Sequence, residues 1–394
     1  METPWPIIHV DLDTGTTTSD EPHRPGAGAL LVFWNNDVAC GDERLAPADK
    51  IPGPDELVRR GEKYRSRMGP LAPIDCDSAR QLSLVIPTRD RPSDLRRCLE
   101  ALSRQVAPPG ETVVVDNNPA NTATRHVASE FAGVKYVAEP KPGLDRARNA
   151  GIMAAGGALI AFCDDDVVLH PSWCSRMTAA FDDDEVQAAT GLVLPLELKT
   201  SAQRLFEFDW GFGRGYAPID FWHGKPSFPD SALQPWLVGA GASMAFRRSV
   251  FDRLGGFDTR LDAGAAGCSG DSEMWYRILM DGGLCRYVPN VVSFHRHRET
   301  LPGLKRQIRA YMRGHVMALF VQQQRRPMPA NVRRALADLP LIYARRVARR
   351  LRRRSGDDIL LGSEIAGYLE GLLYFVSHLR EDDPLPSAAV SVPR

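Results

Sequence analysis

The sequence predicts an α/β fold, in which a mostly parallel sheet is flanked by helices. Between residues 82 and 163, short apolar runs alternate with segments of helical periodicity. This alternation is typical of βαβ units, whose strands are parallel. Polar and acidic residues directly follow several of the runs, and ligands of parallel sheets bind beyond the carboxyl ends of the strands. A small β-containing module before the sheet and a helical region after it complete the predicted architecture.

The apolar runs have the length and composition of strands that are buried on both faces. We expect such strands at residues 82–87, 112–116, 134–138, 158–163 and 186–194. Helices are expected near residues 122–131 and 144–155. A further helix is expected after the first strand, with Ser93 as its N-cap and with apolar side chains at helical spacing, namely Leu95, Cys98, Leu99 and Leu102.

Three regions are expected along the chain. Residues 1–78 are predicted to be a small accessory module with short strands at 7–12 and 30–34 and a helix near 57–67. No residue pattern in this module suggests chemistry, so we expect a structural role. Residues 79–300 contain the alternating strands and helices. Residues 301–394 are expected to form a basic, amphipathic helical region that ends in a disordered tail.

Charge is distributed unevenly in this chain of 394 residues, although the formal net charge is zero. Residues 301–354 contain 15 Lys and Arg but a single acid, Asp338. Such asymmetry points to an anionic partner for this region, either phosphates, lipid headgroups or nucleic acid. Ordinary hydrophobic and charged contents, 43% and 25%, argue against disorder of the whole chain.

The cysteines and the N-terminus indicate the cellular compartment in which the protein is expected. Seven cysteines at irregular spacing, without a C-x-x-C pair, argue against a disulfide framework and against a zinc ribbon. The first 20 residues lack the basic start of a signal peptide, and no apolar run reaches about 18 residues. We therefore expect a cytoplasmic protein, with peripheral contact on the inner face of the membrane as an open alternative.

Asp164, Asp165 and Asp166 directly follow the strand expected at 158–163. Adjacent carboxylates repel one another unless a cation is present, and Mg²⁺ and Mn²⁺ prefer oxygen ligands that they share with substrate phosphates. The alternative is a solvated acidic turn, which is our interpretation of the similar triplet at residues 182–184.

Other segments at strand ends and helix starts each allow a functional and a structural interpretation. Asp116 closes the second strand and is able to accept a hydrogen bond from a nucleobase, or simply to form a turn. The segment from Pro87 to Arg89 closes the first strand. The segment from Gly143 to Gly151 opens a helix with arginines, and its alternative reading is a capped helix with an exposed basic face.

Taken in order, the blocks LSLVIPTRDR, VVVDNN, GLDRARNAG and LIAFCDDDV resemble the family 2 glycosyltransferases, whose fold is GT-A. The later blocks GAGASMAFRRSVFDRLGGFD, GDSE and VVSFHRH are similar to that family as well. The resemblance covers about residues 80–300. It implies a metal-dependent enzyme that takes a sugar from a nucleotide-sugar donor and passes it to a glycan, lipid-linked or small-molecule acceptor.

The resemblance also implies roles for individual residues. The nucleotide-sugar donor would contact Pro87, Thr88, Arg89, Asp116, Asn149, Asp164 and Asp165. The divalent ion, Mg²⁺ or Mn²⁺, would be bound by Asp164, Asp166 and His295. His297 is interpreted as a structural histidine.

Asp271 matches the catalytic base of the family. The chain departs from the common pattern here, because the family often has Glu-Asp and this sequence has Gly270-Asp271. The departure leaves the tuning of the carboxyl pKa in doubt. One base acting on one face of the sugar predicts inversion at the anomeric carbon.

The acceptor is expected at the aromatic stretch that runs from Phe206 to Trp236. Aromatic rings bind the apolar faces of sugars, although most of these rings are equally well explained as core. Trp236 is the best acceptor-side candidate, together with Gly239, Ala240 and Gly241.

The C-terminal region is expected to contain a basic helix around residues 343–354 and a second helix around 359–379. A basic amphipathic helix is able to lie on an anionic bilayer. The alternative is that both helices pack on the catalytic domain and that the arginines are solvated.

Two rival functions remain. A sugar-phosphate nucleotidyltransferase would share the sheet and the metal carboxylates, but it would need a glycine-rich phosphate loop after the first strand. A basic nucleic-acid-binding protein would explain the arginines, but no base-reading motif accompanies them. We expect no nucleic acid partner.

Overall fold

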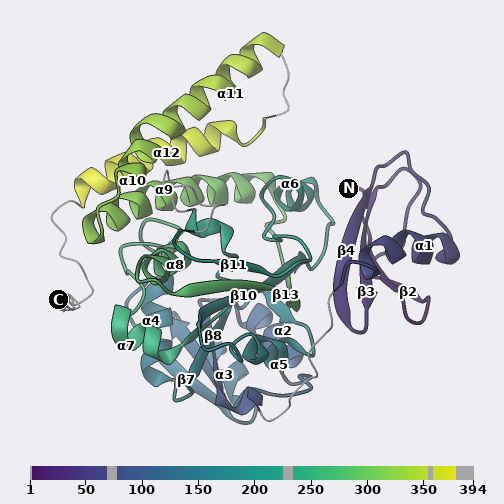
Figure 1. Cartoon of the computed structure of the whole chain (residues 1–394), viewed down its shortest axis with the longest axis horizontal. Coiled ribbons are helices and arrows are strands. Elements are labelled where there is room, and N and C mark those ends of the chain that lie inside the picture. The colour runs from purple at the N-terminus through teal and green to yellow at the C-terminus, as the bar shows by residue number, and fades with distance from the viewer. Residues whose placement is uncertain (1, 69–77, 225–233, 354–357, 379–394) are drawn as a thin grey trace.

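The computed structural model describes residues 2–68, 78–224, 234–353 and 358–378. A large mixed sheet lies at its centre (Figure 1). Its strands in spatial order are β11 (Ile219–Phe221), β13 (Leu284–His295), β10 (Val186–Pro195), β12 (Ser243–Arg247), β8 (Leu159–Cys163), β5 (Leu82–Thr88), β6 (Glu111–Asn117) and β7 (Val134–Glu139). The short strand β9 (Val167–Leu169) pairs with β13 outside this path.

The strands predicted between residues 82 and 163 are confirmed, and all four lie parallel as β8-β5-β6-β7. The other half of the sheet is mixed. Strand β12 runs antiparallel to both β8 and β10, whereas β10 and β13 are parallel. Because β5, β6 and β8 run in one direction, their carboxyl ends open on a common edge, as expected for a ligand site.

Helices cover both faces of the sheet. One face is covered by α4 (Leu144–Ala154), α7 (Arg248–Leu254) and α8 (Gly270–Met280). The other is covered by α2 (Pro92–Leu102), α3 (Ala123–Ser129) and α5 (Trp173–Ala179), preceded by the short 3-10 helix η1 (Ser78–Gln81). Ser93 is not the N-cap of α2. Arg91 takes the capping position and the helix begins at Pro92, two residues earlier than predicted, because proline is suited to the first helical turn.

The N-terminal residues form a second sheet, which appears in purple in Figure 1. Its strand order is β2 (Thr17–Ser19), β1 (Ile7–Asp11), β3 (Ala29–Asn35) and β4 (Val38–Leu45), and α1 (Pro54–Arg65) packs on one face. The other face shares a core with the large sheet. Trp34 stacks on His170 with ring centroids 5.3 Å apart, and Arg44 lies 4.0 Å from the ring centroid of Phe208.

Phe208 belongs to α6 (Ser201–Trp210), a helix that lies between the N-terminal sheet and the C-terminal region. The predicted helical C-terminal region is confirmed. It consists of α9 (Leu301–Arg325), α10 (Pro329–Arg333), the π-helical turn η3 (Arg334–Asp338), α11 (Leu339–Arg353) and α12 (Leu361–Ser377). The predicted disordered tail lies outside the described residues.

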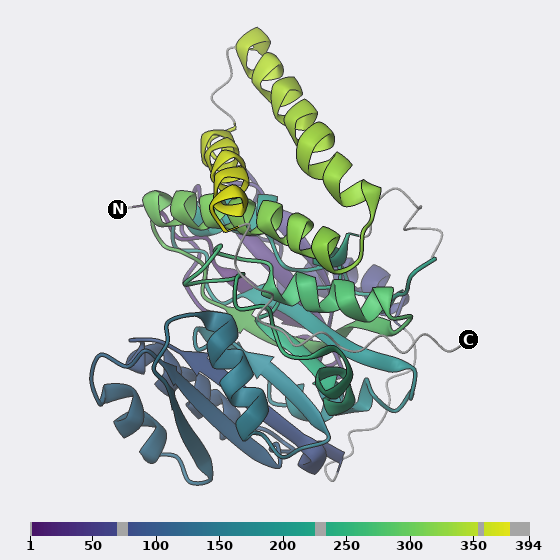
Figure 2. The same ribbon diagram turned by 90° about the vertical axis from the view of Figure 1, so that its left-hand side faces the viewer.

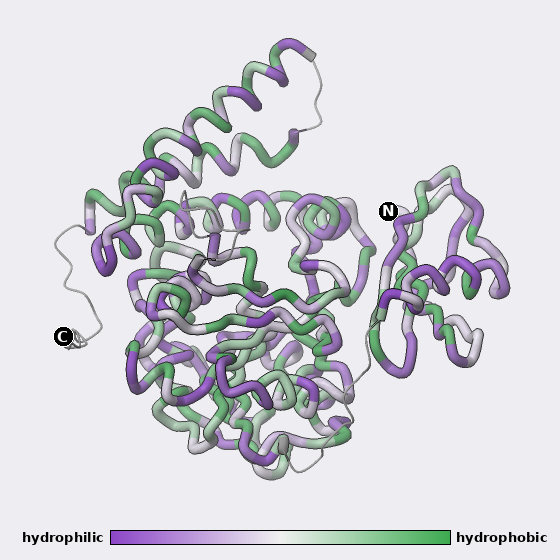
Figure 3. Tube along the Cα trace, in the orientation of Figure 1, coloured by the Kyte–Doolittle hydropathy of each residue, from purple (hydrophilic) through white to green (hydrophobic). Residues whose placement is uncertain are grey.

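Helix α12 packs closely on α9, whereas α11 projects from the body of the molecule (Figures 1 and 2). Close packing requires glycine, because a Cβ added at Gly367 would collide with the main chain of Arg309. Hydrophilic and hydrophobic residues alternate along α11 (Figure 3), and Leu351 is 75% exposed there. Within the described part of the chain, no helix is long and apolar enough to cross a membrane.

Candidate active site

A cavity of about 990 Å³ opens at the carboxyl ends of β5 and β8 and continues beneath the C-terminal helices. It brings together most of the residues that the sequence singled out. These are Pro87, Thr88, Arg89, Asp164, Asp165, Asp166, Trp236, Gly239, Ala240, Gly241, Asp271 and His295.

The acidic triplet follows β8 at the floor of the cavity. The Thr88 hydroxyl donates to Asp165 Oδ2 over 2.7 Å. Arg91 donates to Asp165 Oδ1 over 3.1 Å and to Asp166 Oδ2 over 3.0 Å. Desolvation and repulsion between the carboxylates raise the pKa of Asp164 to about 7 and that of Asp165 to about 6. A cation among them would relieve this repulsion.

Three of the side chains fit a divalent ion. One ligand atom each from Asp164, Asp166 and His295 lies within 4.8 Å of the others. His295 Nε2 is 3.4 Å from Asp166 Oδ1. Burial lowers the pKa of His295 to about 4, so the imidazole is neutral near pH 7 and is able to offer a lone pair. Two carboxylates and one neutral imidazole suit Mn²⁺ or Mg²⁺.

His297 continues this arrangement away from the cavity. Its Nδ1 lies 3.0 Å from His295 Nδ1, and its Nε2 lies 2.8 Å from Glu207 Oε2 on α6. His297 is 3% exposed and its ring packs 4.7 Å from that of Phe206. The residue that the sequence suggested was only structural therefore ties His295 to a carboxylate.

Asp271 lies in the first turn of α8, on the other side of the cavity. The amides of Gly241 and Ser272 donate to its two oxygens over 2.9 and 2.6 Å. Burial, and then the neighbouring Asp262, raise the pKa of Asp271, while Arg148 opposes the shift. The missing acidic neighbour at position 270 left the tuning of this carboxyl pKa in doubt, and burial in the fold is the main cause that raises it.

Gly241 lies against Asp271 and Arg148, a contact that the sequence did not reveal. A Cβ at this position would lie 2.9 Å from Asp271 Oδ2 and 2.9 Å from the Arg148 guanidinium. The glycine therefore allows the main-chain amide to approach the carboxylate.

Arg148 is the main residue that sequence reasoning misplaced. The arginines of α4 were given an exposed basic face as one reading, but Arg148 is 2% exposed. It donates to Asp145 over 2.9 Å and to Asp262 over 2.7 Å, and it lies 4.0 Å from Asp164. Because Asp262 is 114 residues away along the chain, no local pattern could have revealed this pairing.

Asp145 lies where the acidic side chain before Asp271 would be, a position at which this sequence has Gly270. A Cβ built on Gly270 would collide with the Asp145 carboxyl group. That carboxyl group therefore fills the space of a side chain at position 270. Burial and the nearby Asp262 raise the pKa of Asp145 well above its usual range. An acidic group is thus present beside Asp271 after all, supplied by α4 instead of α8.

The two remaining predicted donor contacts differ. Asp116 is buried at the end of β6, where the Tyr136 hydroxyl donates to Oδ2 over 2.9 Å. Its Oδ1 is buried and has no hydrogen-bond partner among the described residues, and Asp116 is not one of the residues that line the cavity. Asn149 is used by the fold instead: its amide bonds the main-chain oxygen and nitrogen of Phe257 over 2.9 and 2.7 Å. A donor contact of Asn149 therefore has no support in this structure.

Trp236 lies in the short 3-10 helix η2 (Pro235–Leu237), on the side of the cavity that the C-terminal helices cover. The Arg334 guanidinium lies 4.3 Å from its ring centroid. The His315 ring meets it edge-on at 4.8 Å. A cation therefore lies next to the Trp236 ring. From the sequence, this ring was expected only to stack on the apolar face of a sugar.

Comparison with known proteins assigns the central part of the chain. Residues 83–255 match the family model described as glycosyl transferase family 2. The glycosyltransferase AglE of Haloferax volcanii is 29% identical over 240 residues, which are 58% of this chain and 71% of the relative.

Two further relatives are longer proteins. The O-antigen biosynthesis protein RfbC of Myxococcus xanthus is 27% identical over 51% of this chain and 16% of its own length. The pre-mycofactocin glycosyltransferase of Mycobacterium tuberculosis (strain ATCC 25618 / H37Rv) is 25% identical over 57% of this chain and 44% of its own length. This chain therefore spans less than half the length of either.

Among solved structures, the mannosyltransferase PcManGT from Pyrobaculum calidifontis, in complex with GDP-Man and Mn²⁺, is similar in fold. The TM-score is 0.51 at 16% identity, over 80% of this chain and 93% of that one. At this identity the likeness concerns the fold, which agrees with the expected GT-A architecture.

Proposed function

We propose that this chain, whose residues 83–255 are a family 2 glycosyltransferase domain, moves a sugar from a nucleoside-diphosphate sugar to an acceptor hydroxyl with inversion. The observation that supports the proposal is one cavity lined on one side by Asp164, Asp166 and His295, and on the other by Asp271. The acceptor classes are a glycan, a lipid-linked molecule or a small molecule.

The donor would lie across the strand ends. Pro87, Thr88 and Arg89 would line the nucleoside. Asp116 would accept an N–H of the base once a side-chain movement exposes its buried, unpartnered oxygen. Asp164, Asp166 and His295 would hold Mn²⁺ or Mg²⁺, which when bound supplies a positive charge to the departing diphosphate. Arg91 holds Asp165 and Asp166 in place for this purpose.

His295 would need its Nε2 lone pair for the ion, so its proton would sit on Nδ1. His295 then donates to His297, and His297 donates through Nε2 to Glu207. Hydrogen bonds of this kind fix the tautomer and the orientation of a metal-binding imidazole. Glu207 and His297 are therefore positioning residues for His295.

Asp271 would take the proton from the acceptor hydroxyl as that oxygen attacks the anomeric carbon from the side opposite the diphosphate. The amides of Gly241 and Ser272 fix the carboxylate, while burial raises its pKa toward the range of a useful base. Because one base acts on one face, each transfer inverts the anomeric configuration.

For the whole chain, we propose a division into a small accessory module at 1–78, the catalytic domain at 79–300 and a basic helical region at 301–394. A role in the synthesis of cell-envelope polysaccharide fits relatives such as the O-antigen biosynthesis protein.

We further propose cytoplasmic location with peripheral binding to an anionic membrane through α11. Leu341 and Leu351 are 49% and 75% exposed on this helix, and Arg345, Arg349 and Arg352 are exposed beside them. Apolar and cationic side chains on one exposed helix are typical of interfacial binding.

A screen of nucleotide sugars tests the proposed function. Release of nucleoside diphosphate should require Mn²⁺ or Mg²⁺ and should stop in EDTA. Asp166→Asn should weaken donor binding only when the metal is present, as measured by calorimetry. Release of pyrophosphate would instead support the nucleotidyltransferase, and unchanged donor binding in EDTA would contradict the metal site.

A further inference from the structure

The cavity has an end that the proposed donor and metal do not use. It is walled by Trp236, by the preceding segment around Arg214, and by helices of the C-terminal region. The residues that these helices contribute include Met312, His315, Arg334, Leu339 and Ile342. This end lies beyond Asp271, on the side from which an acceptor would approach.

Arg214 and Arg334 are half-buried cations without a carboxylate partner among the described residues. Arg214 donates only to main-chain oxygens, those of Gly211, Gly213, Trp236 and Leu237, at 3.0–3.2 Å. Arg334 donates through Nε to His315 Nε2 over 3.3 Å and lies 4.3 Å from the centroid of the Trp236 ring. Its neighbour Asp338 is bound to Arg333 instead.

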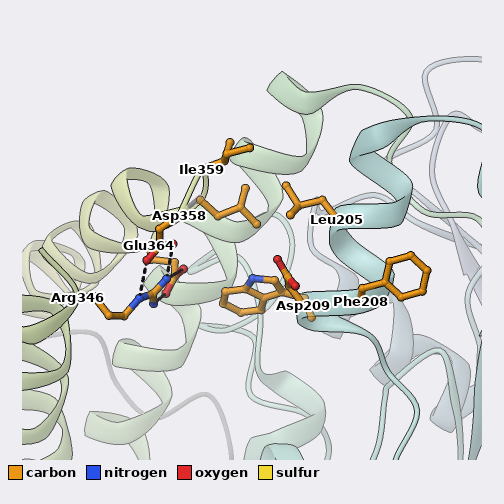
Figure 4. A pocket seen from close by; sticks show the side chains of 9 residues that line it. Leu205, Phe208, Asp209, Arg346, Asp358, Ile359 and Glu364 are labelled. Carbon is orange, nitrogen blue, oxygen red and sulfur yellow. Dashed lines mark hydrogen bonds and ion pairs between the residues drawn. The ribbon is translucent and has the colours of Figure 1, made fainter. Parts of the chain in front are cut away.

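Several other buried or partly buried arginines are paired with acids, whereas Arg248 and Arg313 donate to main-chain oxygens instead. Arg346, at the border between this cavity and a smaller one of about 500 Å³, contacts both Asp358 and Glu364 (Figure 4). Arg148 pairs with Asp145 and Asp262. A desolvated cation without an anion is costly. Arg334 lines the cavity and, unlike Arg214, Arg248 and Arg313, has no main-chain acceptor among the described residues, so it is better explained by a ligand that brings the negative charge.

The titratable groups around Arg334 and Arg214 make no direct carboxylate contact with either cation among the described residues. Burial, and then Arg334 itself, lower the pKa of His315 to about 3, so this imidazole is neutral and only accepts a hydrogen bond. Tyr343 and Asp338 are the other titratable groups near Arg334, and Tyr287 and Asp271 are those near Arg214. Burial lowers the pKa of both arginines, which agrees with incomplete charge compensation.

We propose that this end of the cavity binds a phosphate ester through Arg334 and Arg214, with an apolar portion of the same molecule along Met312, Leu339 and Ile342. A planar guanidinium binds phosphate through two parallel hydrogen bonds, and the terminal nitrogens of Arg334 have no other acceptor among the described residues. Arg214 already donates four of its five N–H groups to main-chain oxygens, so it contributes one further N–H. The ligand is therefore an amphiphilic phosphate ester. The inference rests on the proposed function, because it makes this ester part of the acceptor. The phosphate belongs either to a lipid-linked molecule or to a water-soluble ester.

Binding of three probes to the full-length protein tests the proposal without knowledge of the natural acceptor. The probes are decyl phosphate below its micellar concentration, decanol and inorganic phosphate, each measured by calorimetry. Decyl phosphate should bind more tightly than decanol. Arg334→Gln should weaken it about 10-fold or more, and Arg334→Lys, which keeps the charge, should recover part of the loss. Arg349→Gln is the matched control, because Arg349 is exposed on α11 and does not line the cavity, and it should leave the affinity unchanged.

The outcomes separate the sources of the phosphate and the two proposals. Tight decyl phosphate with weak inorganic phosphate indicates a lipid-linked ester, and equal affinities indicate a soluble one. Equal binding of decyl phosphate and decanol, or an affinity that does not change in Arg334→Gln, overturns the anion site. A wild-type protein that binds decyl phosphate in an Arg334-dependent manner and yet releases no nucleoside diphosphate from any nucleotide sugar would contradict the proposed function. That result would still support the phosphate-ester site.

Discussion

The two ends of the cavity differ in the sign of their charge and in the part of the chain that builds them. At the donor end, three carboxylates, those of Asp164, Asp165 and Asp166, outnumber the two cations beside them: Arg91, which contacts Asp165 and Asp166, and Arg148, which lies 4.0 Å from Asp164. At the far end, Arg214 and Arg334 have no carboxylate partner in the described ranges. The negative end suits a cation and the positive end suits an anion. This difference in charge agrees with the proposal that a metal-bound donor lies on one side of the cavity and a charged acceptor on the other.

The difference also explains what the sequence could predict. The donor end is built from residues that follow strands or open helices, such as Asp116, Asp164 and Asp271. Hydrophobic periodicity locates those elements, and parallel strands bring their ends to one edge. The predicted strands and the helical C-terminal region are present for that reason.

The far end depends on contacts between distant segments. Arg334 meets Trp236 and His315 only because the C-terminal helices fold back over the cavity. Likewise, Asp145 occupies the space beside Gly270 through the packing of α4 against α8. Neither contact has a local sequence pattern, so neither was predicted. Asn149 is a motif residue whose amide binds the main chain of Phe257, and its predicted donor contact stays a prediction.

Among the predicted substitutions, the largest effect on turnover is expected at Asp271. Asp271→Asn keeps the shape of the side chain and removes the base, so turnover should fall by roughly 10²-fold or more. Donor affinity and melting temperature should stay close to those of the wild-type protein. Near-normal turnover would mean that Asp271 only caps α8.

The pH dependence of turnover should follow the same carboxylate. The raised pKa of Asp271 means that the ionised base is lost as pH falls, beginning above the ordinary range of an aspartate. Turnover should then decrease about tenfold for each pH unit below that pKa. A pH profile of kcat with saturating donor and metal measures this limb. A profile that stays flat down to the ordinary aspartate range would contradict a buried base.

The donor end should also be sensitive to the groups behind the metal ligands. His297→Phe keeps the ring that packs on Phe206 but removes the hydrogen bond to His295, so Mn²⁺ affinity should fall about 10- to 100-fold. Titration of Mn²⁺ with calorimetric detection, in the presence of the nucleoside diphosphate, gives this affinity.

His170→Phe is the control for that change. His170 is also a buried histidine next to an aspartate, with its Nε2 3.2 Å from Asp37, and it stacks on Trp34. It should leave Mn²⁺ affinity unaltered. His297→Asn, which keeps an acceptor near the position of Nδ1, should restore part of the affinity. Equal losses in His170→Phe and His297→Phe would reduce the role of His297 to general stability.

The smallest effect is expected on the outer surface of the far end. Arg349→Gln in α11 removes one exposed charge, which contributes about 1 kcal/mol to binding of an anionic surface. Partitioning onto vesicles of phosphatidylserine and phosphatidylcholine should fall about fivefold. Arg96→Gln on α2, also exposed, serves as the control. Equal partitioning of Arg349→Gln and the wild-type protein at low salt would argue that α11 does not touch the bilayer.

The anomeric configuration of the first product tests the central claim most directly, because it depends on how the donor, the metal carboxylates and Asp271 are arranged around one carbon. Proton NMR of the reaction mixture, recorded before the product mutarotates or is hydrolysed, reports it. The arrangement of a single base opposite the diphosphate predicts a product whose anomeric configuration is inverted relative to the nucleotide sugar. A product that retains the configuration of the donor would contradict the account.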